Sequence, residues 1–245
     1  MLSVIIPTLN EQNYLPKLLT SIKRQGFSDY EIIVADAGSS DGTVEVAGGY
    51  GCKVIQGGLP AYGRNRGAEV AKGALLLFLD ADVVLPDGFF EKALAEYEAR
   101  RLKIASFGLV PVPKSKKYSL LFNIFYNVPI RCLEHLLPHA AMAILMERAI
   151  FEMVGGFDET IKIAEDHELA RRVKKLGKYG LIKSVKIFVS PRRFEKDGGL
   201  RTYLKFLLAE LYMIFRGPIR RELFRYQFDH HNTESGRKVA RQQPR

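Results

Sequence analysis

The chain has 245 residues and is 47% hydrophobic, enough to bury a core for one large α/β domain or for two small ones. It has no apolar run of about 18 residues and no signal-like start, so we expect neither a spanning helix nor a signal peptide. The two cysteines, Cys52 and Cys132, lack metal-type spacing, which indicates two buried thiols in a reducing, cytoplasmic compartment.

The net charge of +10 is unevenly distributed along the chain. Residues 1–100 carry 9 Lys and Arg residues against 13 Asp and Glu residues, whereas the remainder carries 28 against 14. This asymmetry indicates an anionic partner for the C-terminal half, and a phosphorylated substrate, an anionic membrane surface or a nucleic acid would each satisfy it.

The first hundred residues alternate between strand and helix patterns. Predicted strands cover residues 2–6, 30–35, 52–56 and 75–79, and an amphipathic or short helical stretch follows each of the first three. Repeated βα units with short connections give right-handed crossovers, so the pattern predicts a mostly parallel sheet.

The apolar run at residues 75–79 leads directly into Asp80 and Asp82. Such a run predicts a strand that is buried on both faces at the centre of the sheet, with both carboxylates at the edge where ligands bind. Aspartates one residue apart point the same way on an extended chain, so the pair can hold one hard cation. A polar turn with solvated carboxylates is the alternative for a single Asp-x-Asp.

Further charged residues are predicted at the same edge of the sheet. Glu11, Asp36 and Asp41 follow the first two strands, and Arg64 is expected on a neighbouring loop. The set fits a nucleotide whose base and ribose donate hydrogen bonds to carboxylates while a metal and an arginine hold its phosphates. The P-loop and Gly-x-Gly-x-x-Gly motifs are both absent.

The second half adds predicted strands at residues 104–112, 140–146 and 181–189 and helices at 148–154 and 164–175. The last helix has acids in its first turn and bases in its last, which its dipole favours, and we expect His167 on its surface. Residues 118–130 are aromatic-rich with almost no polar face, which favours core over an amphipathic element on a membrane or acceptor groove.

The C-terminal residues are strongly basic. Arg192 and Arg193 are expected either to contact a phosphate or to be solvated. Residues 196–231 predict a basic amphipathic helical extension that either packs on the preceding domain or docks at an anionic membrane. Residues 232–245 are polar and basic, and we expect them to be disordered.

Five segments occur together in an order and spacing that are typical of one enzyme family. They are VIIPTLNE at 4–11, DAGSSDGT at 36–43, LDAD at 79–82, GGFDE at 155–159 and EDHEL at 165–169. Over residues 1–195 the chain resembles the family 2 nucleotide-sugar glycosyltransferases. The resemblance implies the GT-A fold, an α/β fold with a mostly parallel central sheet flanked by helices. Its Rossmann-like nucleotide-sugar-binding half would cover residues 1–100 and its acceptor half residues 101–195.

The resemblance also assigns roles to individual residues. It implies that the nucleotide pocket is lined by Pro7, Thr8, Leu9 and Glu11, that Asp36 accepts from the base and that Arg64 lies near the donor. The Asp-x-Asp motif would comprise Asp80, Ala81 and Asp82, with Asp82 as the ligand of Mn²⁺ or Mg²⁺, and Asp166 would be the catalytic base. Leu9 departs from the family, because many relatives carry a stacking aromatic residue there.

The implied activity is transfer of a sugar from a UDP or GDP donor to a hydroxyl of a glycan or lipid-linked acceptor in cell-envelope synthesis, without a nucleic-acid partner. Direct displacement assisted by one base implies inversion at the anomeric carbon. We expect the protein in the cytoplasm, at the inner face of the membrane and in peripheral contact with it.

Two other classes of protein fit parts of the sequence. In a phosphatase of the haloacid-dehalogenase type Asp80 would be the nucleophile and Asp82 the acid, but that motif usually opens the first strand, whereas three βα units precede it here. A non-enzymatic anion or nucleic-acid binder would use the basic C-terminal half, but the acidic edge of the sheet would repel phosphates.

Overall fold

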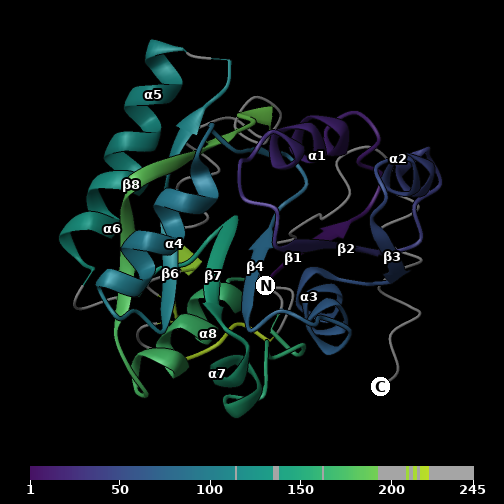
Figure 1. Cartoon of the computed structure of the whole chain (residues 1–245). Helices are drawn as coiled ribbons and strands as arrows, with labels where there is room; N and C mark the ends of the chain where they lie inside the picture. The colour runs from purple at the N-terminus through teal and green to yellow at the C-terminus, as the bar shows by residue number, and fades with distance from the viewer. Residues whose placement is uncertain are drawn as a thin grey trace.

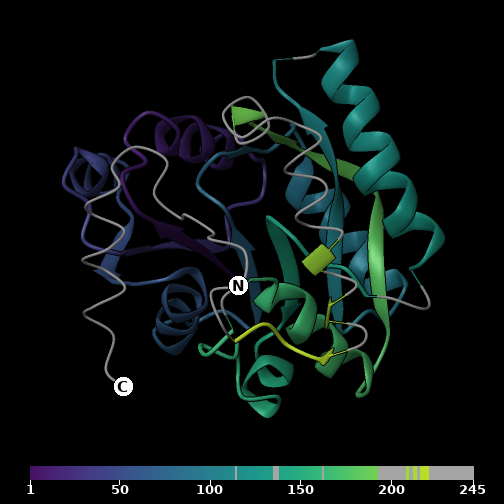
Figure 2. The same cartoon turned by 180° about the vertical axis from the view of Figure 1, so that it is seen from behind.

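The computed structural model describes residues 1–113, 115–134, 138–161, 163–192, 208–209, 212–213 and 216–220. The described chain folds around a single mixed sheet of eight strands, with helices on both faces (Figures 1 and 2). In sheet order the strands are β3 (Lys53–Gln56), β2 (Tyr30–Asp36), β1 (Leu2–Thr8), β4 (Leu75–Leu79), β7 (Ala143–Glu147), β6 (Ile104–Pro111), β8 (Tyr179–Val189) and β5 (Val83–Val84).

Six of these eight described strands run in the same direction, which confirms the predicted mostly parallel sheet. The exceptions are β7, which is antiparallel to both β4 and β6, and the short β5, which is antiparallel to β8. Because β7 joins the strands of the first hundred residues to those of the second half, the two halves share one sheet.

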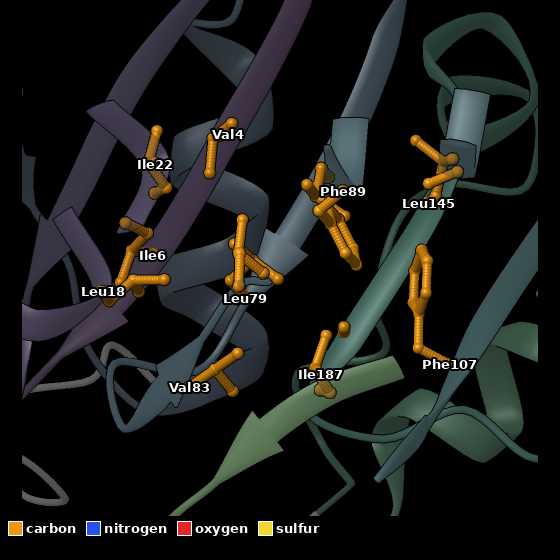
Figure 3. Packing of buried hydrophobic residues seen from close by; sticks show 14 of the residues in the cluster. Val4, Ile6, Leu18, Ile22, Leu79, Val83, Phe89, Phe107, Leu145 and Ile187 are labelled. Carbon is orange, nitrogen blue, oxygen red and sulfur yellow. The ribbon is translucent and has the colours of Figure 1, made fainter. Parts of the chain in front are cut away.

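Helices pack on both faces because alternate residues of the central strands point to opposite sides. The helices are α1 (Leu15–Lys23), α2 (Thr43–Gly49), α3 (Pro60–Glu69), α4 (Phe89–Ala99), α5 (Lys116–Phe122), the π-helix η1 (Asn123–Asn127), α6 (Val128–Cys132), α7 (Arg148–Met153) and α8 (Glu165–Lys174). Val4 and Ile6 face a core with α1 and α4, whereas Ile5 faces a second core with α3, α7 and α8. Figure 3 shows Ile6, Leu18 and Leu79 in the first of these cores.

The apolar strand β4 lies between β1 and β7 near the centre of the sheet, and Leu76 to Leu79 are at most 1% exposed. This confirms the central buried strand that the sequence predicts. The carboxyl ends of β1, β2 and β4 therefore meet at one edge, as expected of parallel neighbours.

Helix α3 packs unusually close to β1. A Cβ atom on Gly67 would lie 2.3 Å from the Ile5 side chain, so this helix approaches the sheet through a glycine. The helix begins at Pro60, and Arg64 therefore lies inside α3 rather than on a loop, which corrects the prediction for that residue. A rigid helix, not a loop, thus positions the Arg64 side chain.

Two predictions of burial are wrong. Cys132 is exposed and Cys52 is only half-buried, so the pair of buried thiols is not observed. Residues 118–130 were expected in the core, but they form helices with one face open to solvent, since Leu120 is 60%, Ile124 49% and Val128 53% exposed. Hydrophobic spacing alone did not distinguish this face from core.

Of the predicted extension at 196–231, the structure describes only residues 208–209, 212–213 and 216–220, and the predicted tail at 232–245 lies outside the described residues. Ala209, Met213 and Ile219 are buried together with Ile163. Within the described part of the chain, no helix combines the length and the apolar character needed to cross a bilayer.

Candidate active site

The loops that follow β1 and β2 are joined by side-chain hydrogen bonds. The Asn10 amide donates to Ser39 Oγ at 2.9 Å, and the Glu11 amide donates to Thr43 Oγ1 at 2.8 Å. Serine, threonine and asparagine satisfy loop amides in this way where no strand partner is available. Hydrogen bonds therefore hold together the two loops at the edge predicted to bind the nucleotide.

The Asp36 carboxylate holds its own loop in shape. One oxygen accepts from Thr8 Oγ1 at 2.9 Å and Ser39 Oγ at 2.6 Å, and the other accepts from the amides of Gly38 and Ser39 at 3.0 and 2.8 Å. Two carboxylate oxygens offer about four acceptor positions, so these bonds match the capacity of the group. The structure thus gives Asp36 a loop-shaping role, and the contact with a base stays a prediction.

The two aspartates of the Asp-x-Asp motif bind different arginines. Asp80 Oδ1 lies 2.8 Å from Arg64 Nη2, whereas Asp82 Oδ2 lies 3.0 Å from Arg192 Nε. The chain turns at these residues, where the Val83 amide donates to the Asp80 carbonyl at 3.3 Å, and Ala81 is buried inside the turn. The chain therefore turns at these residues instead of staying extended, and the binding of one cation by both carboxylates stays a prediction.

Arg64 connects this turn to the start of α8. Its guanidinium is buried, and Nη1 lies 2.6 Å from Glu165 Oε1 while Nη2 reaches Asp80. Burial alone would lower the pKa of Arg64, but the neighbouring carboxylates Asp80, Glu165 and Asp166 raise it above its usual value. Arg64 is therefore a fixed positive charge between the Asp-x-Asp turn and Asp166.

Arg192 is the second cation of the site. It is paired with carboxylates rather than solvated. It donates to both oxygens of Glu11, at 2.9 and 2.6 Å, as well as pairing with Asp82, and its guanidinium lies over the Tyr14 ring at 4.3 Å. The pKa of Glu11 is raised to about 7, mainly by burial. Arg192 lowers this pKa, whereas the charges of Asp82 and Asp80 raise it further.

The oxygen ligands of Glu11 and Asp82 suit a hard divalent cation. Since one guanidinium contacts both residues, a single cation can also span them. No group of three or more His, Cys, Asp or Glu side chains among the described residues is arranged to hold a metal. The chain would therefore supply one or two carboxylates, with phosphates and water completing the coordination, as is common for Mg²⁺ at nucleotide sites.

Asp166 lies in the first turn of α8, beside the Arg64 cluster. Its Oδ1 accepts from the His167 amide at 2.9 Å, while its other oxygen accepts no hydrogen bond from the described residues. Burial and the Glu165 charge raise the pKa of Asp166 to about 8, although Arg64, His139 and the His167 amide each lower it. Burial thus outweighs the helix dipole, which by itself would favour the ionised form.

Aromatic side chains pack beside Asp166. The rings of His139 and His167 lie 3.7 Å apart between centroids, and the Tyr126 ring lies 5.5 Å from His139. The His139 carbonyl accepts from the hydroxyls of Tyr179 at 2.6 Å and Ser106 at 3.0 Å, which fixes this histidine. His167 is buried, so its predicted surface position is wrong.

Of the predicted site residues, the structure brings two groups to one edge of the sheet, one around Arg64 and one around Arg192. Pro7 and Thr8 end β1 beside Asp36, and Leu9 follows directly after this strand. The sequence missed Tyr126 and His139, because nothing local marks them. It left the partners of Arg192 open, although this arginine lies three residues after the end of β8.

A mixed sheet with carboxylates at the carboxyl ends of its parallel strands defines an α/β protein that binds its ligand at this edge. The chain belongs to Glycosyl transferase family 2, whose family model matches residues 3–139. The match covers more than half of the chain and includes both aspartates of the Asp-x-Asp turn.

Curated relatives agree with this family. The chain is 29% identical over 217 residues to the minor teichoic acid biosynthesis protein GgaB of Bacillus subtilis (strain 168), covering 80% of this chain and 23% of GgaB. It is 28% identical over 202 residues to the uncharacterized glycosyltransferase EpsJ of the same strain, covering 72% of this chain and 58% of EpsJ. The chain therefore spans well under two thirds of the length of these relatives.

Solved structures share the fold. Staphylococcus aureus TarS 1-349 in complex with UDP-GlcNAc superposes with a TM-score of 0.62 at 21% identity, covering 86% of this chain and 66% of that one. The mannosyltransferase PcManGT from Pyrobaculum calidifontis, in complex with GDP-Man and Mn²⁺, gives a TM-score of 0.64 at 18% identity, covering 88% and 70%. These similarities confirm the predicted GT-A fold.

Proposed function

We propose that this chain is the catalytic part of an inverting glycosyltransferase that moves a sugar from a nucleoside-diphosphate sugar to an acceptor hydroxyl. The observation that supports this most is the buried Arg64 cluster, which joins Asp80 of the Asp-x-Asp turn to Glu165 beside Asp166. The residues proposed for the donor and for the base thereby meet in one place.

In the proposed reaction the acceptor oxygen attacks the anomeric carbon from the side opposite the diphosphate. The acceptor hydroxyl gives its proton to Asp166, the new carbon–oxygen bond forms, and the diphosphate leaves with the electron pair of the bond that breaks. Asp166 suits this task better than Glu165, because Glu165 is paired with Arg64 while one Asp166 oxygen accepts no hydrogen bond from the described residues. A general base of this kind contributes about 10² to 10⁴ in rate.

The donor side of the proposed site lies at the ends of β1, β2 and β4. Its proposed residues are Pro7, Thr8, Leu9, Glu11, Asp36, Arg64, Asp80, Ala81 and Asp82. The complexes of TarS with UDP-GlcNAc and of PcManGT with GDP-Man support a UDP or GDP donor.

We assign Asp82 as the residue that holds Mn²⁺ or Mg²⁺, with Glu11 beside it. The Mn²⁺ in the PcManGT complex supports this assignment. A bound divalent cation would stabilise the negative charge that develops on the leaving diphosphate. Both carboxylates are paired with Arg192, so a cation held by Asp82 would replace at least the contact between Arg192 and Asp82.

The proposed acceptor is a glycan or lipid-linked hydroxyl of the cell envelope, used at the cytoplasmic face of the membrane. The similarity to the minor teichoic acid biosynthesis protein GgaB supports this class of acceptor.

A thermal-shift panel of UDP, GDP, ADP and CDP with Mn²⁺ or Mg²⁺ tests the proposal. A nucleotide at about 100 times its dissociation constant should stabilise the fold by roughly 2.7 kcal/mol, because it binds only the folded state. Asp82→Asn should remove the metal-dependent part of that shift. The absence of any nucleotide shift, together with hydrolysis of a simple phosphate ester, would instead support the phosphatase alternative.

A further inference from the structure

One helical column of the molecule presents apolar side chains to solvent. The column runs through α5, η1 and α6 from Lys116 to Cys132 and lies along the outer edge of the molecule, at the opposite end from α2 and β3 (Figures 1 and 2). Leu120, Ile124 and Val128 are spaced four residues apart, so they share one face. They are about half exposed or more, and we call them the apolar stripe.

The opposite face of the same column is buried. Phe122 is 4% and Ile130 3% exposed, and the Tyr126 hydroxyl is enclosed on the side of the candidate active site. The π-helical turn contains more residues per turn than an α-helix, which keeps residues four apart closer to one line along the axis. The column thus has a continuous inner face and a continuous outer face.

Asn127 fixes the orientation of these two faces. Its side-chain carbonyl accepts from the Leu109 amide at 2.8 Å, and its side-chain amide donates to the Leu109 carbonyl at 2.8 Å. This pair of bonds attaches the column to β6, because the Asn127 side chain satisfies the backbone amide and carbonyl of Leu109 as a residue of a neighbouring strand would. The column therefore cannot roll to bury the apolar stripe without losing both bonds.

Both ends of the column that carries the apolar stripe are positively charged. From residue 99 to residue 133 the sequence contains seven Lys and Arg residues and no Asp or Glu. Lys116 and Lys117 at one end of the column and Arg131 at the other are exposed. The next acid, Glu134, is buried and paired with Arg100 and Lys183, so it does not offset these charges at the surface.

We infer that the apolar stripe is a docking surface for an anionic lipid bilayer, with the three side chains entering the headgroup region and Lys116, Lys117 and Arg131 facing the lipid charges. Exposed apolar residues flanked by cations on one helix face are the features that bind such an interface. A second copy of the chain fits less well, because symmetric pairing of two such columns would bring cations against cations.

This surface goes beyond the proposed transfer and does not depend on it. It would nevertheless place the bilayer on the outer face of the helix whose inner face carries Tyr126, next to His139 and His167 beside Asp166. An acceptor carried by a lipid could then approach the proposed base without leaving the membrane surface.

The chain contains no tryptophan, so a single introduced indole reports its own environment. We would compare Ile124→Trp with Leu176→Trp, since both native residues are 49% exposed and Leu176 lies among basic residues away from the column. With vesicles of phosphatidylcholine and phosphatidylglycerol, emission should shift to shorter wavelength for Ile124→Trp only. With phosphatidylcholine alone neither variant should shift.

Co-sedimentation of the full chain with the same vesicles gives an independent readout. Leu120→Ser/Ile124→Ser/Val128→Ser should lower binding by about tenfold or more, because apolar burial drives insertion. The control Met153→Ser/Leu176→Ser removes two apolar residues elsewhere that are 68% and 49% exposed, and it should bind like the wild type. Lys116→Gln/Lys117→Gln/Arg131→Gln should weaken binding and reduce its dependence on salt.

Vesicle binding that survives in the triple serine variant, or an equal emission shift at position 176, would overturn the assignment and direct attention to the basic residues after 192. A wild-type dimer that the triple serine variant converts to monomer would identify a second copy as the occupant instead. Nucleotide thermal shifts on every variant separate this inference from the proposed function, because they should be unchanged.

Discussion

At the scale of single residues, two arginines divide four carboxylates between them. Arg64 takes Asp80 and Glu165, and Arg192 takes Glu11 and Asp82. Asp166 lies beside the first group, and no arginine pairs with it among the described contacts. The remaining oxygen of Asp166 accepts no hydrogen bond from the described residues, and we propose that this oxygen takes the proton of the acceptor hydroxyl.

Asp166→Asn tests this assignment directly. The amide has nearly the same size but cannot take a proton, so the transfer rate should fall by about 10² or more while the dissociation constant of the donor stays near wild type. In the wild type the rate should rise with pH up to about 8, because Asp166 must be deprotonated to act. Glu168→Gln on the same helix is the control, and a rate within about threefold of wild type in Asp166→Asn would move the role elsewhere.

If Asp82 holds the metal as proposed, Arg192 should compete with that metal for the same oxygens. Arg192→Gln should therefore bind Mn²⁺ more tightly than the wild type in the absence of donor, since the substitution removes the positive charge that is paired with Asp82 and Glu11. Isothermal titration with Mn²⁺ measures the effect, and Arg66→Gln, which removes an exposed arginine paired with Glu69, controls for net charge. Equal affinities in all three proteins would show that the guanidinium does not occupy the metal position.

At the scale of elements, the repeating βα units and the central strand β4 could be predicted because their hydrophobic patterns are local. The same patterns predicted α8 to within a residue or two, including its acidic first turn. The exposure of one face of the α5 column could not be predicted, since an apolar stripe looks the same whether it is covered or open. What decides it is the contact of Asn127 with Leu109, 18 residues away.

The candidate site likewise has features that could be predicted from the sequence and features that could not. The acids at the ends of β1, β2 and β4 could be predicted because they follow strands directly, and the family motifs marked Asp166. The division of Asp80 and Asp82 between two arginines could not, because the Arg192–Glu11 pair joins residues 181 positions apart. A sequence pattern contains no information about which long-range cation a carboxylate will meet.

Asn127→Leu tests the attachment of the column to β6. The substitution leaves the Leu109 amide and carbonyl without their side-chain partner, so the free energy of unfolding should fall by about 1–3 kcal/mol. Urea unfolding followed by circular dichroism measures this. Asn123→Ala removes only an exposed bond to Asn127 and should cost less; equal losses in both variants would contradict the special role of Asn127.

At the scale of the whole molecule, both arginines connect the first hundred residues to the second half of the chain. Arg64 reaches from α3 to α8, and Arg192 reaches from the end of β8 to the loop after β1. The ion pairs that shape the candidate site are therefore also contacts between the two halves of the chain.

The stability of the molecule should depend on pH through Asp166. Its pKa in the folded protein, about 8, lies above the ordinary carboxyl value, so the folded state binds more protons than the unfolded state between those two values. The free energy of unfolding contributed by this group should consequently fall as pH rises through that window. Melting temperatures across the window should decline less steeply in Asp166→Asn; parallel profiles for the two proteins would contradict the raised pKa.

Strand β7 has a consequence for any attempt to divide the chain. The family match ends at residue 139, four residues before this strand begins, yet β7 supplies one of the two hydrogen-bonded neighbours of β4. A fragment cut at residue 139 would leave the leucine-rich edge of β4 with unpaired backbone groups. Exposed apolar edges of this kind recruit strands from other molecules, so such a fragment should aggregate rather than remain a dispersed, functional half.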